Sequence, residues 1–289
     1  MKFITFMENE AIFLGVLGVD ETVFKFNEAG VNFGNMHEFI VNHSSKDMEN
    51  LKNLSLKSYG VSMNEIKLLA PINPSQDVIC LGINYMDHAK ESYKFKNKDF
   101  DGKREYAVYF SKRVNEAIGS GEFINSHSDI TSQLDYEVEL GVIISKDALN
   151  VDIKDAKEYI FGYTIINDIS ARDLQNRHKQ FYFGKSLDAS CPIGPWIVSA
   201  DEIDSSNLYI KCFVNGELRQ NSNTKNMIFD ESFVIAELSK GMKLKAGSLI
   251  SMGTPSGVGI GFNPPKFLKS GDSIRCEIEG IGILENEIL

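Results

Sequence analysis

The sequence lacks the motifs of several common metal and nucleophile sites. Its four cysteines, Cys80, Cys191, Cys212 and Cys276, form no CxxC pair, which argues against a zinc knuckle or a redox motif. We expect buried free thiols, as in a reducing compartment. The HExxH and GxSxG patterns are also missing. Their absence excludes two common hydrolase mechanisms, that of zinc peptidases and that of the nucleophile elbow.

The sequence also has little positive charge and no long apolar run. Lysine and arginine number 30 against 40 aspartates and glutamates, a net charge of −10, so the basic footprint of a nucleic-acid-binding protein is missing. No apolar stretch reaches the roughly 20 residues that span a membrane. Glu8 and Glu10 interrupt the first apolar segment, and the first arginine is Arg104, which argues against secretory and mitochondrial leaders. We expect a cytoplasmic protein without nucleic-acid or membrane partners.

The 289 residues, 43% of them hydrophobic, are enough for a large core. Prolines at 71 and 74 interrupt the pattern, as in a linker, and predict a small N-terminal domain (1–70) before a larger domain (71–289). Strands and helices do not alternate regularly, so we expect an α+β fold with a mixed, mostly β core. The expected strands cover residues 12–19, 22–26, 78–81, 107–110, 137–144, 161–166, 209–214, 248–252, 273–279 and 281–288, with a hairpin at Asn215-Gly216, and the expected helices cover 46–56, 152–159, 170–179 and 230–240.

Glu137 and Glu139 stand two residues apart, directly before the apolar run from Leu140 to Ile144. In an extended strand both carboxylates point to the same face. The apolar run predicts a strand covered on both sides, where two like charges repel each other and lose hydration. A divalent cation held by both would compensate them. The alternative is a solvated strand face, which this segment alone leaves open.

A third carboxylate, Asp168, follows the apolar stretch 161–166. Ser170 can cap a following helix, on which Arg172 and Gln175, three residues apart, share a face. The carboxylate of Asp168, the guanidinium of Arg172 and the amide of Gln175 would then lie close together. The alternative is an ordinary turn or helix-cap aspartate.

An all-oxygen set of Glu137, Glu139 and Asp168 selects magnesium or manganese rather than zinc. Nearby in the sequence, Lys185 follows an aromatic run and a glycine. Its ammonium can supply fixed positive charge to an oxyanion that develops beside the cation, with Asp188 available to orient it. Lys185 is otherwise an ordinary surface lysine.

His88 and Glu91 lie three residues apart in a short predicted helix. At this spacing the carboxylate can orient the imidazole, which is the outline of a general-base pair. The polar stretch 92–104 that follows is compatible with a mobile lid carrying the pair over a pocket. A plain surface pair is the alternative.

The segment 253–261 is rich in glycine but lacks the Gly-Lys-Ser/Thr ending of a P-loop. We therefore expect a tight turn that exposes Thr254. Its hydroxyl and the neighbouring amides can hold a substrate carboxylate.

Six motifs follow one another in order from about residue 75 to 289. They are Gly82-Ile83-Asn84-Tyr85 through His88 and Glu91, Asp135 to Leu140, Asn167 to Asp173 through Gln175, Gly184-Lys185-Ser186, Cys191 to Trp196, and Gly253 to Gly259. Together they resemble the motifs of the fumarylacetoacetate hydrolase family, in its acylpyruvase and 2-hydroxyhepta-2,4-diene-1,7-dioate isomerase-like branch. One departure is Leu187, which stands where a phenylalanine often follows the lysine and serine.

The resemblance implies a roll of mixed β-sheets around a central site, a small N-terminal domain and a homodimer. It also implies one Mg²⁺ or Mn²⁺ per subunit and a role for each site residue. The implied metal ligands are Glu137, Glu139 and Asp168, the implied catalytic residues are His88, Glu91 and Lys185, and the implied substrate contacts are Arg172, Gln175, Thr254, Lys112 and Asp188.

These parts predict an enzyme that acts on small 2-oxo acids through a metal-stabilised enolate. We rank hydrolysis of the carbon–carbon bond of an acylpyruvate or fumarylpyruvate first. Isomerisation or tautomerisation of 2-oxo dicarboxylates and decarboxylation of oxaloacetate follow. The alternative from another class is a non-catalytic, metal-dependent binder of oxo acids, which would have no evident need for His88, Glu91 and Lys185.

Overall fold

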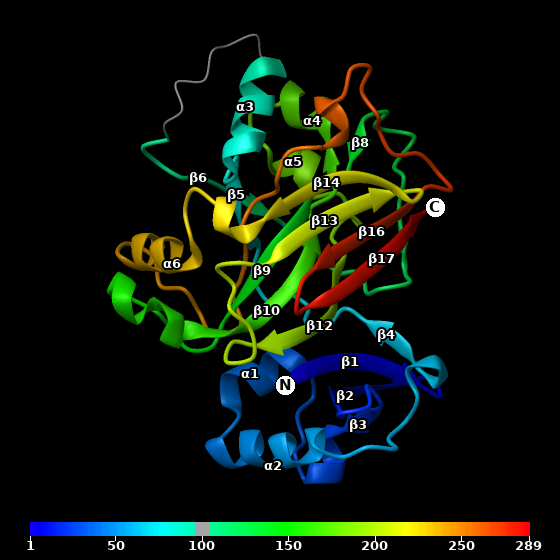
Figure 1. Ribbon diagram of the computed structural model, residues 1–289, viewed down its shortest axis with the longest axis vertical. Helices are drawn as coiled ribbons and strands as arrows, with labels where there is room; N and C mark the ends of the chain where they lie inside the picture. The colour runs from blue at the N-terminus through cyan, green and yellow to red at the C-terminus, as the bar shows by residue number, and fades with distance from the viewer. Residues whose placement is uncertain (96–103) are drawn as a thin grey trace.

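The computed structural model describes residues 1–95 and 104–289, and strands dominate this part of the chain (Figure 1). The expected α+β, strand-rich architecture with mixed sheets is confirmed. Three sheets form within the described residues: one of ten strands, one of five and one of two. None of the helices there combines the length and the apolar character that a bilayer crossing requires.

The ten-stranded sheet runs in the order β3-β2-β1-β12-β10-β9-β15-β5-β6, and β4 pairs with β1. Its strands pair antiparallel except for β15 and β5, which are parallel. The strands are β1 (Lys2–Glu8), β2 (Ala11–Leu17), β3 (Val23–Lys25), β4 (Lys67–Leu69), β5 (Val78–Gly82), β6 (Val108–Lys112), β9 (Val138–Ile144), β10 (Ile160–Asn167), β12 (Ile193–Ser199) and β15 (Leu249–Ser251).

The five-stranded sheet has the order β14-β13-β16-β17-β7, and Figure 1 shows most of it in front of β9 and β10. The predicted hairpin at Asn215-Gly216 is confirmed, since it joins β13 to β14. The strands are β7 (Phe123–Ile124), β13 (Tyr209–Val214), β14 (Glu217–Asn223), β16 (Ser273–Ile278) and β17 (Gly282–Ile288), and β8 (Leu134–Asp135) pairs separately with β11 (Ser170–Ala171).

The helices surround the sheets. Ser44 caps α2, but two helix predictions were wrong in detail. The segment 152–159 forms a 3-10 helix, η3, and Ser170 lies in β11 and donates to the Asp168 carbonyl instead of capping α4. The helices are α1 (Met36–Asn42), α2 (Ser45–Ser55), α3 (Met86–Phe95), α4 (Arg172–Arg177), α5 (Tyr182–Lys185) and α6 (Glu231–Ser239), and the 3-10 helices are η1 (Phe26–Ala29), η2 (Met63–Glu65), η3 (Ile153–Tyr159), η4 (Thr224–Asn226) and η5 (Gly259–Gly261).

Strands β9 and β10 are buried on both faces, as their apolar sequences predict. Val138, Leu140 and Val142 belong to the apolar core shared with the five-stranded sheet. Ile143 and Ile166 belong to a second core that includes residues of α1 and α2. Because side chains alternate along a strand, Glu139 faces away from Val138 and Leu140, toward the functional pocket described below.

The N-terminal residues extend the large sheet. Strand β1 pairs with β12, so β1 to β4 lie at one end of that sheet, below the rest in Figure 1. The division into domains 1–70 and 71–289 stays a prediction. All four cysteines are buried free thiols, as predicted.

Candidate metal centre and active site

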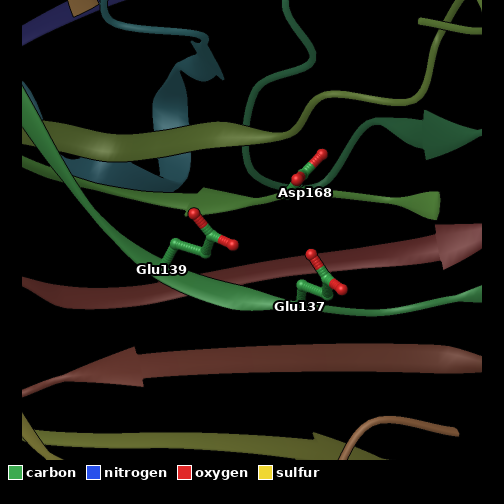
Figure 2. A group of neighbouring side chains, drawn as sticks. All are labelled: Glu137, Glu139 and Asp168. Atoms are coloured by element: carbon green, nitrogen blue, oxygen red, sulfur yellow. The ribbon is translucent and has the colours of Figure 1, made fainter. Parts of the chain in front are cut away.

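Glu137, Glu139 and Asp168 come together at one edge of the β9–β10 pair. Strands β9 and β10 are antiparallel, with Ile166 opposite Glu139, so the end of β10 brings Asp168 beside the beginning of β9. One oxygen from each carboxylate lies within 4.8 Å of the others. Figure 2 shows Glu139 on β9 and Glu137 on the segment that leads into it, both projecting on the side of Asp168. Their exposed fractions are 5%, 1% and 0%, so the solvated alternative is wrong.

Two of the three carboxylates are matched by buried cations. Glu137 accepts from Arg172 Nη2 at 2.6 Å and from Lys185 Nζ at 2.5 Å. The same ammonium lies 2.5 Å from Asp168 Oδ2. Asp168 Oδ1 has the Lys112 ammonium 2.9 Å away as an ion pair, outside hydrogen-bond alignment, and accepts no hydrogen bond from the described residues.

Glu139 is held by neutral donors instead. Its Oε2 accepts from Ser251 Oγ at 2.6 Å and from the Gly253 amide at 2.8 Å. Burial, and then the charges of Asp168 and Glu137, raise the pKa of Glu139 well above its usual value. Burial opposes ionisation of Glu137 too, but Arg172 and Lys185 outweigh it and hold that pKa well below its usual range.

This set fits a divalent cation. It offers three buried carboxylates. Asp168 has an oxygen that accepts no hydrogen bond from the described residues. Glu139 has a raised pKa, and a nearby positive charge would stabilise its anionic form. All candidate ligand atoms are oxygens, the donors that magnesium and manganese prefer. Glu137, Glu139 and Asp168 would hold the ion.

The raised pKa of Glu139 predicts a pH-dependent stability. The folded chain holds the Glu139 proton more tightly than the unfolded chain does, so this contribution is complete below the unfolded pKa and is lost as the pH rises toward the folded pKa. The free energy of unfolding of the chelator-treated wild-type protein, measured relative to that of Glu139→Gln, should therefore fall by up to about 1.4 kcal/mol per pH unit in that range. Urea unfolding of both proteins from about pH 5 to about pH 8 measures the difference. A difference that stays constant with pH contradicts the raised pKa.

Glu137 and Glu139 line a pocket, and Asp168 lies beside them, outside the lining. Gln175, Asn176 and Thr254 add uncharged polar groups to the wall. The ionisable side chains of the lining, named the charged end, are His88, Glu91, Glu137, Glu139, Arg172 and Lys185. The large apolar side chains of the lining, named the apolar end, are Leu81, Ile83, Phe110, Phe181, Val258 and Ile260.

His88 and Glu91 form the predicted pair on α3. His88 Nδ1 lies 2.9 Å from Glu91 Oε2, and Glu91 Oε1 accepts from the Gly257 amide at 3.0 Å. Asp87 adds a second link to the glycine-rich loop (residues 253–261), because its Oδ2 accepts from Ser256 Oγ at 2.9 Å. Gly257 has φ 101°, and a Cβ there would lie 1.9 Å from a backbone oxygen of β14. The loop therefore positions the pair over the pocket.

The predicted lid, residues 92–104, falls largely on residues 96–103, which lie outside the described residues. The helix α3 that carries His88 and Glu91 continues to Phe95.

Arg172 and Gln175 share a face of α4 and both line the pocket, as predicted. Arg172 Nη1 lies 3.1 Å from Gln175 Oε1, so the amide NH₂ of Gln175 stays available as a donor.

Asp135 is an important residue that the sequence reasoning left without a role. Its fully buried carboxylate accepts from Arg172 Nε at 2.8 Å, from the Gly259 amide at 2.6 Å and from the Ile260 amide at 3.1 Å. One side chain thus orients Arg172 and anchors the glycine-rich loop. The available signal was its place beside Glu137 within the same motif.

We predict that Asp135→Asn lowers kcat/KM by about 10- to 100-fold, the usual effect of losing a partner that orients metal ligands. Arg172 would keep Glu137 as its only carboxylate partner, so its position and the loop would both loosen. Steady-state kinetics and thermal unfolding of the variant provide the measurement. Asp173→Asn is the control, because Asp173 bonds Thr131 and does not line the pocket. Equal losses in both variants would contradict the specific role of Asp135.

Three predicted substrate contacts need correction. Asp188 is exposed, accepts from Asn115 at 2.8 Å and does not orient Lys185, which points to Glu137 and Asp168. Lys112 does not line the pocket, because its ammonium lies between Asp168 and the Ile169 carbonyl.

Thr254 lines the pocket but is 3% exposed rather than prominent on a turn. Its hydroxyl donates to the Val138 carbonyl at 2.9 Å and accepts from Gln220 at 2.7 Å. The single hydrogen of the hydroxyl is thereby donated within the protein, and Thr254 ties the glycine-rich loop to β9.

Known proteins resemble this chain in sequence and fold. Residues 77–289 match the family model described as fumarylacetoacetate (FAA) hydrolase C-terminal. Oxaloacetate tautomerase YisK of Bacillus subtilis is 44% identical over an alignment of length 305 that covers 100% of both chains. A solved fumarylacetoacetate hydrolase from Exiguobacterium antarcticum is 39% identical with a TM-score of 0.87, covering 100% of this chain and 99% of that one.

A more distant solved structure has the same fold. The 2-hydroxyhepta-2,4-diene-1,7-dioate isomerase from Mycobacterium marinum is 26% identical with a TM-score of 0.72, and the match covers 100% of this chain and 98% of that one. The family match spans most of the chain and includes the three clustered carboxylates and the pocket around them. The chain belongs to the fumarylacetoacetate hydrolase family.

Proposed function

We propose that this protein is a divalent-metal-dependent enzyme that moves a proton at the carbon beside the ketone of a small 2-oxo acid, with keto–enol tautomerisation of oxaloacetate as the first candidate reaction. The observation that carries the proposal is the buried set of Glu137, Glu139 and Asp168, of which the two glutamates line the same pocket as His88. The 44% identity to a named oxaloacetate tautomerase supports this choice of reaction.

The charged end of the pocket would hold the oxo-acid head of the substrate. A divalent cation, when bound to the three carboxylates, supplies a Lewis acid that polarises the ketone. Lys185 is 2% exposed and lines the same end of the pocket. Its fixed positive charge favours the form of the substrate in which the ketone oxygen gains negative charge.

His88 is the proton carrier of the proposal. Pairing of Nδ1 with Glu91 favours the tautomer in which Nδ1 carries the hydrogen, so Nε2 is free to accept a proton. In tautomerisation the carbon beside the ketone loses a proton to the base, and the ketone oxygen gains one. The reaction therefore needs no water and no bond cleavage between heavy atoms.

Hydrolysis of an acylpyruvate is the second candidate. The sequence alone ranked it first, and the apolar end of the pocket is compatible with an acyl group. It additionally requires a water positioned against the distal carbonyl and a proton for the departing carbon. Proton transfer makes fewer demands on the residues that line the pocket, so we rank tautomerisation above hydrolysis and decarboxylation.

Proton NMR of enol-oxaloacetate and acetylpyruvate, incubated with protein and Mg²⁺ or Mn²⁺, tests the proposal by product identity. We expect metal-dependent acceleration of enol-to-keto conversion, abolished by chelator. Cleavage to pyruvate and acetate without accelerated tautomerisation would favour hydrolysis, and pyruvate with carbon dioxide would favour decarboxylation. Binding without any turnover would favour the non-catalytic alternative.

Two further properties are proposals from the family resemblance and composition. We propose a homodimer with one cation per subunit, which light scattering and metal analysis would check, and a cytoplasmic location.

A further inference from the structure

The apolar end of the pocket begins close to the metal-ligand set. Lys185 Nζ, which contacts Glu137 at 2.5 Å, lies 5.0 Å from the centre of the Phe110 ring. The Phe181 ring packs edge-on against Phe110, with 5.4 Å between ring centres and an interplanar angle of 75°. Both rings line the pocket. An aromatic wall therefore stands only about one side chain away from the oxygens that would hold the cation.

Ile83, between β5 and α3, also lines the pocket. Its φ of 56° places a β-branched residue in the left-handed region, which favours glycine. The next residue fixes this conformation, because the buried Asn84 side chain donates to the Met252 and Phe229 carbonyls and accepts from the Phe229 amide. Glycine would adopt the same backbone without strain. The presence of isoleucine at this strained position therefore indicates that its side chain has a function in the pocket.

The described part of the wall is apolar. The uncharged polar side chains of the pocket lining are those of Gln175, Asn176 and Thr254. Among the described residues that line the pocket, the cationic side chains are Arg172 and Lys185, and both are paired with carboxylates. A long chain that extends from the oxo-acid head toward this wall would meet the two rings.

We propose that Ile83, Phe110 and Phe181 form a chain-length limit that restricts this site to short 2-oxo acids and excludes 2-oxo acids with long alkyl chains. The limit rests on the proposed function, because it assumes that the oxo-acid head lies at the three carboxylates. Short substrates fill the space between the metal-ligand set and the wall. Each added methylene beyond that space must displace a ring or open α3, whose links to the glycine-rich loop oppose the movement.

The test measures binding along a homologous series, so it does not depend on turnover. Pyruvate, 2-oxobutyrate, 2-oxohexanoate and 2-oxooctanoate are titrated by calorimetry into the protein with saturating Mg²⁺. We expect affinity to fall by at least about tenfold between 2-oxobutyrate and 2-oxooctanoate. In Phe181→Ala the long acids should recover about tenfold, while pyruvate stays within about threefold of wild type. Phe183→Ala is the matched control, because Phe183 is 47% exposed and does not line the pocket.

Ile83→Gly gives a second readout. It should relax the same length limit and leave the melting temperature no lower than that of wild type, because glycine accepts the backbone conformation. A lower melting temperature with an unchanged length profile would assign Ile83 to packing alone and remove it from the limit.

The outcomes separate this proposal from the proposed function. Affinity that rises steadily with chain length in wild type, or an unchanged profile in Phe181→Ala, overturns the wall. A length limit in binding without any turnover of oxaloacetate or acetylpyruvate overturns the proposed function and leaves the wall standing. Failure of pyruvate itself to bind overturns both.

Discussion

The Glu139→Gln variant is expected to lose about 10³-fold or more of its metal-dependent kcat/KM while keeping its fold. A bound cation contributes several kcal/mol to stabilising charge on a ketone oxygen, and each 1.36 kcal/mol corresponds to about tenfold in rate. The amide is isosteric, and its carbonyl oxygen can still accept from Ser251 and Gly253, as the carboxylate does. The variant also removes the cost of ionising a buried carboxyl group, so the metal-free variant should be at least as stable as wild type near neutral pH.

Kinetics of oxaloacetate tautomerisation over a range of Mg²⁺ concentrations, together with thermal unfolding, measures this effect. Glu231→Gln is the control: Glu231 is a 2% exposed glutamate that bonds Ser205 and does not line the pocket. Activity of Glu139→Gln close to wild type would contradict a role for Glu139 as a ligand. So would an equal loss in the control.

The second large effect concerns His88. We expect His88→Gln to lower kcat by about 10²- to 10⁴-fold, the usual contribution of a positioned general acid or base. The variant should bind Mg²⁺ and pyruvate with nearly wild-type affinity, because His88 is not one of the three candidate metal ligands. Glu91→Gln should lower kcat less and change the pH profile, since Glu91 acts through the imidazole.

Pre-steady-state and pH-dependent kinetics separate the two steps. His178→Gln is the matched control, because His178 is exposed at the end of α4 and does not line the pocket. A fall in metal or pyruvate affinity as large as the fall in kcat would show that His88 supports binding and not proton transfer.

Local sequence patterns predicted the parts of the site whose geometry follows from a single element. The two-residue spacing of Glu137 and Glu139, next to an apolar run, predicted one buried face of a strand. The three-residue spacing predicted that His88 and Glu91 meet on a helix, and the structure places them 2.9 Å apart. Strand and helix periodicity is local, so such pairs can be read from the chain alone.

The errors arose where distant segments decide the contacts. Asp188 is close to Lys185 in sequence, yet α5 ends between them and Lys185 turns to carboxylates 17 and 48 residues away. Thr254 is buried by bonds to Val138 and Gln220, both far from it in sequence. Asp135 has partners in α4 and in the glycine-rich loop. No periodicity within one segment reveals such contacts, because they depend on how the sheets and loops pack together.

The same reasoning explains the misassigned helix start. Ser170 has the chemistry of a cap, but it pairs with Asp135 across β11 and β8, and this tertiary pairing overrides the local preference. The helix then begins at Arg172.

The central claim is that Glu137, Glu139 and Asp168 hold one divalent cation where a 2-oxo acid binds. Titration of Mn²⁺ into chelator-treated protein, followed by electron paramagnetic resonance with and without pyruvate, tests it most directly. We predict one site per chain in wild type, a spectrum that changes when pyruvate is added, and loss of the site in Glu139→Gln. Absence of a stoichiometric site, or a site that survives in the variant and ignores pyruvate, would contradict the claim.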